Sequence, residues 1–157
     1  MRWVDLKVAR PRYRMTVAYQ VDPRLQLGLE YNPAVGEIGP TVNWLLSPET
    51  ARSPLVSFGT SSDRIGTPRD QRAYYVTFAK RLDETFAPYV SLNYSEYDDR
   101  LNVPFGANIF IGDRWVLLPM FDGRKSHLLL TYRERSTSVS LIWVWYRHPG
   151  IAVSWGF

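Results

Sequence analysis

Large apolar side chains occur at every second position through most of this 157-residue chain. Leu27 and Leu29, for example, alternate with Gln26, Gly28 and Glu30. Similar runs cover residues 14–20, 74–79, 90–95 and 138–145, with a shorter one at 41–44. Because successive side chains of a strand point to opposite faces, a period of two predicts strands rather than helices. Each strand then has one bulky apolar face and one face of small or polar groups.

The composition of the second face separates a water-facing sheet from a lipid-facing one. Its residues are mostly Gly, Ala, Ser, Thr and Asn, whereas a water-facing sheet surface usually carries Lys, Glu and Thr. Small uncharged side chains suit the interior of a narrow barrel. The large Leu, Val, Trp and Tyr side chains would then point outward, as in transmembrane barrels. The alternative is a soluble lipocalin-like barrel or a β-sandwich, in which the apolar face points inward.

The last seven residues continue the alternation. Ile151, Val153, Trp155 and Phe157 alternate with alanine, serine and glycine. This segment resembles the C-terminal targeting strand of bacterial outer-membrane β-barrels, which has a terminal Phe and apolar residues at every second position before it. The resemblance is to that class as a whole. It implies location in the bacterial outer membrane and contact with its lipid. It also implies recognition by the outer-membrane assembly machinery, with these four residues as the signal.

Polar turns divide the chain into about twelve strands, with ten as the alternative. One set of turns lies at residues 22–24, 47–54, 82–85, 112–114 and 133–136. The connections of the other set lie at residues 10–12, 32–36, 61–71, 96–102, 122–126 and 147–150. The two sets alternate along the chain, as the two ends of an up-and-down barrel require, and we place the second set on the extracellular side.

We therefore predict a single all-β domain, residues 1–157, folded as a transmembrane antiparallel up-and-down β-barrel. Its weakest strand is the first, which would contain Val4, Leu6 and Val8, with Asp5 and Lys7 pointing inward. The sequence begins without a signal peptide. We expect either a mature chain with an added initiator Met or a fragment of a larger barrel.

Composition fits this class and argues against others. Hydrophobic residues make up 45% of the chain, yet the mean hydropathy is −0.24, as expected if half of each strand faces a polar lumen. No run approaches the roughly 18 apolar residues of a membrane helix. The net charge of +4 comes from scattered basic residues, which is a poor pattern for nucleic-acid binding. Aromatic residues near predicted strand ends would form interfacial girdles: Tyr13, Tyr31, Trp44, Tyr74, Tyr94, Tyr97, Trp115, Trp143, Tyr146 and Trp155.

The sequence offers little catalytic chemistry. His127 and His148 are the only histidines, and there is no cysteine. Small outer-membrane lipid A acyl-modifying enzymes and phospholipases use His with Ser and a carboxylate, but their local signatures are absent. The His and Asp spacing does not suit a metal. We predict no catalytic residue, no cofactor and no metal site.

Charged residues on the inward face point to the lumen. The alternation directs Arg14, Arg81 and Arg133 inward, with Glu30 as the clearest inward acid. A ring of arginines would favour anions. Alternatively, these charges pair with each other and make a closed barrel rigid.

Basic residues of the second set of connections could bind lipopolysaccharide phosphates: Arg64, Arg69, Arg72, Arg124, Lys125 and Arg147.

Three segments in the C-terminal half are apolar on both faces. By the alternation, their inward residues would form one apolar wall of the lumen: Val116, Leu118, Met120, Leu129, Ile142 and Val144. These residues could pack together and close the pore. They could also hold an apolar ligand or a partner's segment, or the wall's outer face could dock on another membrane protein.

Two functions compete for this barrel. The first is a structural or anchoring subunit of an envelope complex, with another membrane protein as its partner. The second is a narrow passive channel that prefers anions. A lipid acyl hydrolase or transferase of the outer membrane is the third.

Overall fold

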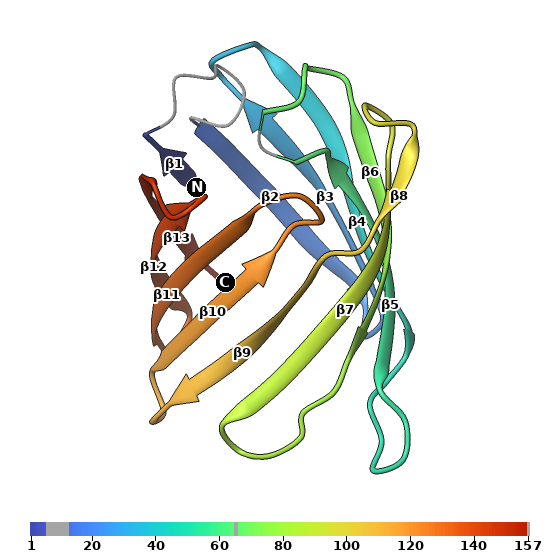
Figure 1. Ribbon diagram of the computed structural model, residues 1–157, viewed down its shortest axis with the longest axis vertical. Helices are drawn as coiled ribbons and strands as arrows, with labels where there is room; N and C mark the ends of the chain where they lie inside the picture. The colour runs from blue at the N-terminus through green and yellow to red at the C-terminus, as the bar shows by residue number, and fades with distance from the viewer. Residues whose placement is uncertain (6–12, 65, 157) are drawn as a thin grey trace.

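The structure is a computed structural model that describes residues 1–5, 13–64 and 66–156 (Figure 1). The described residues form strands and turns and no helix. The strands are β1 (Arg2–Val4), β2 (Tyr13–Asp22), β3 (Leu25–Asn32), β4 (Glu37–Ser47), β5 (Leu55–Ser62), β6 (Arg72–Ala79), β7 (Phe86–Ser95), β8 (Arg100–Asn102), β9 (Phe105–Ile111), β10 (Trp115–Phe121), β11 (Ser126–Glu134), β12 (Thr137–Val144) and β13 (His148–Trp155).

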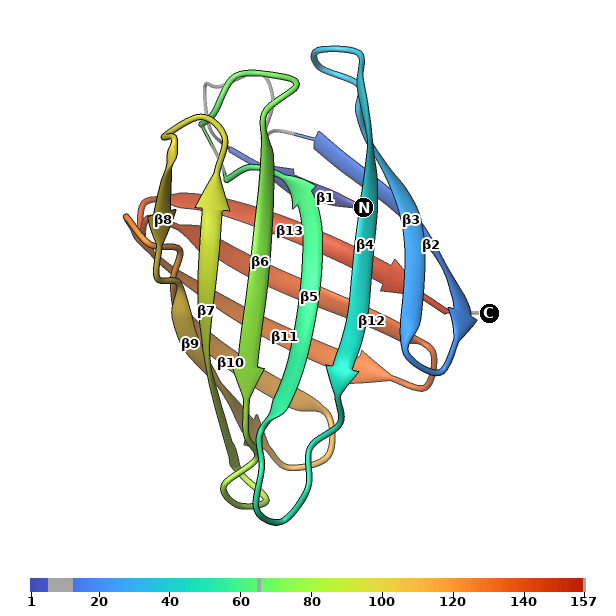
Figure 2. The same cartoon turned by 90° about the vertical axis from the view of Figure 1, so that its right-hand side faces the viewer.

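The strands close into an antiparallel barrel. Strands that follow one another in the sequence pair with each other, except β8 and β9, and β1 also pairs with β13. Both β8 and β9 pair with β7, so they are two parts of one strand interrupted at Val103 and Pro104. The barrel therefore has 12 strands, which confirms the prediction of an up-and-down barrel. Figure 2 shows the wall of β3–β7 in front of the wall of β9–β13.

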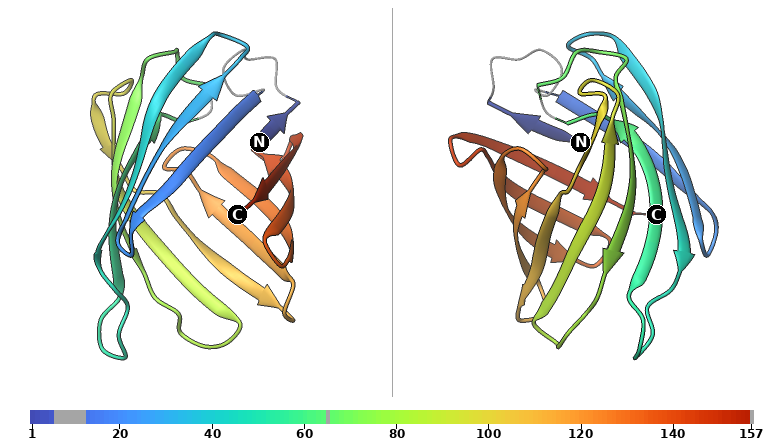
Figure 3. Two further views of the ribbon diagram at one scale, coloured as in Figure 1. Left: turned by 180° about the vertical axis from the view of Figure 1, so that it is seen from behind. Right: turned by 45° about the vertical axis from the view of Figure 1, so that its right-hand side comes forward.

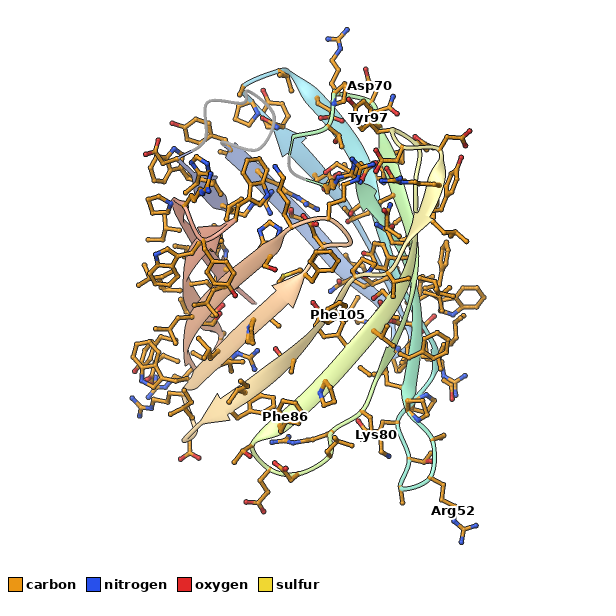
Figure 4. The ribbon with its side chains drawn as sticks, in the orientation of Figure 1. Arg52, Asp70, Lys80, Phe86, Tyr97 and Phe105 are labelled. Atoms are coloured by element: carbon orange, nitrogen blue, oxygen red, sulfur yellow. The ribbon has the colours of Figure 1, made fainter. Side chains whose placement is uncertain are left out.

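The two sets of turns lie at opposite ends of the barrel. We call the end with the β3–β4, β5–β6, β7–β8, β10–β11 and β12–β13 connections the loop end, and the other the turn end. In Figure 4, Asp70 and Tyr97 mark the loop end and Arg52 marks the turn end.

One predicted turn is displaced. The β12–β13 hairpin turns at Trp145 and Tyr146, before the predicted turn at 147–150. Both residues have positive φ, 55° and 54°, and the Arg147 N–H donates to the Val144 carbonyl at 3.1 Å. This geometry matches a type I′ turn, which usually contains Asn or Gly. Its two aromatic residues gave no turn signal in the sequence.

The apolar face of the barrel points outward and the polar face points inward. Val17, Leu29 and Ile38 are more than half exposed. On the opposite face, the polar side chains of Glu30 and Ser91 are buried. This is the reverse of a soluble lipocalin-like barrel, so that alternative does not describe the fold. The ten aromatic residues expected near strand ends are all exposed.

The first strand differs from the prediction. It spans Arg2–Val4, and the side chain of Val4 is fully buried inside the barrel, whereas Asp5 is exposed. The predicted facing was therefore wrong for Val4 and Asp5. Val4 lies opposite Gly150, which leaves the space that it fills. Leu6, Lys7 and Val8 lie outside the described residues.

β1 covers only part of β2. Its pairing with β2 consists of Arg2 opposite Arg14 and Trp3 opposite Tyr13. Beyond these pairs, β2 has no partner on its β1 side among the described residues. We call this edge of β2, residues 16–21, the seam. Val17 and Tyr19 at the seam are 71% and 74% exposed. Figure 3 shows β2 and β13 on either side of β1.

Candidate functional site: the barrel interior

A network of charges around two buried carboxylates joins three loops at the loop end. Asp98 forms ion pairs with Arg64 and with Arg124, the latter at 2.7 Å. Asp63 accepts from the Ser95 hydroxyl and, at 2.6 Å, from the Arg64 N–H. The side chains of Asp63 and Asp98 are 0% and 5% exposed. We call these five residues the loop cap. It ties the β5–β6, β7–β8 and β10–β11 loops to one another.

A second group of charges lies below the loop cap on the inner wall. Glu30 of β3 pairs with Arg14 of β2 and, at 3.7 Å, with Arg72 of β6. Glu30 also accepts a hydrogen bond from the Ser62 N–H. Gly39 makes room for the Arg72 guanidinium, because a Cβ there would lie 2.5 Å from its Nη1. These contacts connect strands on both sides of β4 and β5.

The four predicted lumen charges do not form one ring. Arg14 and Glu30 meet as a pair, but Arg81 and Arg133 lie at the turn end and are exposed. The Arg81 guanidinium donates to the carbonyls of Asp83 and Glu84 and stacks 4.7 Å from the centre of the Phe110 ring. An arginine ring is therefore not present in the described residues.

The predicted apolar wall lies on one side of the interior. Cross-strand pairs place Val116 with Thr131, Leu118 with Leu129, and Met120 with His127. Val116, Ile142 and Val144 are buried, and Leu129 packs against Ile142, Val144 and Val4. The wall thus forms the main apolar core of the described residues, inside a barrel whose other inward faces are polar.

A cavity of about 370 Å³ in the barrel interior is lined both by charged residues and by the apolar wall. Its charged lining includes Arg2, Arg14 and Arg64. Its apolar lining consists of Met120, Leu129, Ile142, Val144 and Ala152, and Ala152 is directly opposite Arg2 on the neighbouring strand. Tyr75 and Asn93 also contribute to it. The interior can therefore present cations and an apolar surface to the same molecule.

His127, to which the sequence analysis gave no role, also lines this cavity. His127 is buried, and its Nε2 lies 2.7 Å from the Asp122 carboxylate. The alternation in the sequence already placed it on the inward face, because it is an even number of residues from Leu129 and Thr131. The hydrogen bonds recorded for the described residues join no hydroxyl to His127, so this pair has no nucleophile beside it.

The C-terminal strand and the basic loop residues have different surroundings. Ile151 and Trp155 are exposed and Val153 is half-buried, while Phe157 lies outside the described residues. Arg64, Arg72 and Arg124 are engaged in ion pairs with carboxylates. Lys125 lies over the Trp145 ring at 3.5 Å. Arg69 and Arg147 are exposed and are the more accessible sites for a phosphate.

Comparison with protein-family models, with curated proteins and with solved structures finds no match for this chain. The described residues contain no helix long and apolar enough to cross a membrane. In the same part of the chain, no group of three or more His, Cys, Asp or Glu side chains could hold a metal ion.

The Asp122 carboxylate is expected to make the loop end sensitive to acid. Its burial alone would raise its pKa, but the hydrogen bonds from His127 and from the N–H groups of Lys125 and Arg124 outweigh burial, and the pKa lies below the ordinary 3.8. A carboxylate with a lowered pKa stabilises the fold above its unfolded pKa, and this contribution is lost as the pH falls through the folded value. We expect Asp122→Asn to be destabilising at neutral pH.

Denaturant unfolding of the wild type and Asp122→Asn at several pH values tests this expectation. The difference in unfolding free energy should shrink as the pH falls below about 4. Asp113→Asn, in the exposed β9–β10 turn, is the control for a change in charge alone. A wild-type advantage that persists unchanged into acid would contradict the account.

Proposed function

We propose that this protein is an integral β-barrel of the bacterial outer membrane, with outer-membrane lipid around its outer face. The apolar outward face and the aromatic residues near the strand ends support this proposal, because a protein surface of this kind is stable in a bilayer and unstable in water. The alternation in Ile151, Val153 and Trp155 supports insertion by the outer-membrane assembly machinery. Exposed Arg69 and Arg147 at the loop end are suited to lipopolysaccharide phosphates.

Within that membrane we propose a structural or anchoring role rather than transport. The loop cap carries this proposal. Three loops meet over the interior through Asp98, Arg64 and Arg124, and the apolar wall fills part of the space below. Ion pairs that hold three loops together over one end of the barrel would narrow a water path for ions. The barrel's remaining role is to present a stable outer surface to lipid and to a partner.

Conductance of the purified full chain in planar bilayers tests the closed interior. We expect no steady conductance from the wild type. Asp98→Ala removes the carboxylate that holds two arginines and should introduce openings. Arg69→Ala, at an exposed ion pair outside the loop cap, should show no steady conductance, like the wild type. A stable conductance from the wild type would overturn the structural proposal.

The second candidate is a narrow anion-preferring channel. The observation that favours it is the set of three arginines, Arg2, Arg14 and Arg64, around the cavity. If the wild type conducts, reversal potentials in a salt gradient should show anion preference. Arg81→Glu should then weaken that preference, because it places a negative charge at the turn end.

We propose that a membrane partner packs against the outward face of β2 at the seam, where large apolar side chains are exposed. These side chains include Val17 and Tyr19. A photo-crosslinking residue at Val17 should give one adduct of defined size in cells, whereas the same residue at Leu92, on the wall formed by β7, should not. Equal labelling from both positions would argue against a partner at the seam.

We propose no catalytic role. A lipid-modifying hydrolase or transferase needs a nucleophile within hydrogen-bond reach of its base. His127 and Asp122 form a base and its orienting acid, without the third member among the contacts of the described residues.

A further inference from the structure

We infer that the interior cavity is a binding site for a single-chain anionic amphiphile, with its acidic head at Arg2 and Arg14 and its chain against the apolar wall. This inference goes beyond the structural role proposed above. Conductance is not its readout, so either proposal can fail without the other.

Arg2 is the cation of the cavity lining that forms no ion pair with a described carboxylate, whereas Arg14 pairs with Glu30 and Arg64 with Asp98. Arg2 and Arg14 are directly opposite each other on adjacent strands, and like charges in that arrangement repel. Glu30 pairs with Arg14. The ion pairs between described residues do not include Arg2, and its buried Nε has no hydrogen-bond partner. An unpaired buried donor on a cation is costly, and an anionic head would satisfy it.

Two carboxylates also line the cavity, and both are already engaged. Asp63 accepts hydrogen bonds from the Ser95 hydroxyl and the Arg64 N–H. Asp122 accepts from two backbone N–H groups and contacts His127. Neither is paired with Arg2, so their hydrogen bonds leave this guanidinium available to a ligand.

The apolar lining of the cavity determines the rest of the ligand. Met120, Leu129, Ile142 and Val144 present apolar surface, which a small hydrophilic anion would leave uncovered. An acyl chain would cover it and gain about 25 cal/mol for each Å² of apolar surface removed from water. The cavity of about 370 Å³ is near the lower end of the roughly 300–1,000 Å³ typical of ligand sites. This volume suits one chain better than a diacyl lipid.

Binding to the full chain in phosphatidylcholine nanodiscs tests the site, with empty nanodiscs subtracted for partition into lipid. The probes share one chain and differ in the head: dodecanoate in its ionised form, dodecanol and dodecyltrimethylammonium. We expect saturable binding of dodecanoate, near one molecule per chain. Dodecanol should bind at least about tenfold more weakly, because it lacks the charge-assisted hydrogen bonds. The amount of dodecyltrimethylammonium bound should be no greater than in empty nanodiscs. Dodecyl phosphate, compared with dodecanoate, shows whether a phosphate or a carboxylate head is preferred.

Two kinds of variant locate the bound molecule. Arg2→Gln should weaken dodecanoate binding by about tenfold and leave dodecanol unchanged. Leu129→Phe fills the apolar side and should weaken both. Arg2→Lys keeps the charge and should retain most of the dodecanoate binding. This variant still tests the need for a positive charge if Arg2→Gln does not fold. Arg100→Gln, at an exposed residue of β8, should match the wild type.

Three results would overturn the inference. The first is binding of dodecanoate no greater than in empty nanodiscs. The second is equal binding of the three head groups, which would indicate unspecific partition. The third is unchanged dodecanoate affinity in a folded Arg2→Gln protein.

Discussion

Leu141→Arg is expected to lower the free energy of unfolding from a lipid bilayer by about 2–4 kcal/mol, the cost of an arginine near the bilayer midplane on a barrel's outer face. Leu141 lies in the middle of β12, and its neighbours across the strands are Leu130 and Ile151. All three side chains are on the outward face, and Leu141 is 46% exposed. An arginine there would have no polar partner and no short path to the interface.

The matched control is Leu82→Arg. Leu82 is 62% exposed but lies in the β6–β7 turn, where a charge reaches water, so the cost should be about 0–1 kcal/mol. Reversible denaturant unfolding of both variants from phospholipid vesicles gives the comparison. Equal costs at the two positions would indicate that the middle of the outer face is not in a bilayer.

Asp98→Ala is expected to destabilise the protein by about 3–5 kcal/mol, because removing one member of a buried ion pair leaves its partners charged and unpaired. Arg64 would lose its ion pair with Asp98, and Arg124 its ion pair at 2.7 Å. The side chain of Arg64 is 13% exposed, so little water can replace the lost carboxylate.

Arg69→Ala measures the effect of an exposed ion pair in the β5–β6 loop, which also contains Arg64. Arg69 and Asp70 are 3.4 Å apart with side chains 68% and 73% exposed, and such pairs contribute about 0–1 kcal/mol. Thermal or denaturant unfolding of the two variants under the same conditions separates the cases. A cost below about 1 kcal/mol for Asp98→Ala would mean that the loop cap does not hold the loops together.

The fold could be predicted from the sequence because its determinants are local. The alternation in segments such as 25–31 sets which face each residue occupies, and the polar turns set where the chain reverses. An antiparallel barrel with short connections needs little more, since neighbours in sequence are neighbours in the sheet. The β12–β13 turn was misplaced because Trp145 and Tyr146 adopt positive φ values that aromatic residues seldom adopt.

The interior could be predicted only in part. The alternation along each strand determined which side chains point inward, so the apolar wall and the inward positions of Arg14 and Glu30 could be predicted from the sequence. Which inward residues meet depends on the stagger and tilt of the strands, and these are properties of the closed barrel. The loop cap joins Arg64 to Asp98 and Arg124 across three loops, and no local pattern specifies those contacts. The same holds for the unpaired Arg2, whose strand has only three residues.

Site-directed spin labelling of neighbouring residues on β7 tests most directly whether the apolar outer face contacts lipid. The chain has no native cysteine, so Leu92→Cys and Asn93→Cys can be labelled singly in vesicle-reconstituted protein. Leu92 faces outward and is 50% exposed, whereas Asn93 lines the cavity. We predict frequent collisions with oxygen and few with a water-soluble relaxation reagent at position 92, and far fewer oxygen collisions at position 93. A label at position 92 that meets the water-soluble reagent as often as a label at the loop residue Asp70 would contradict the membrane-spanning account.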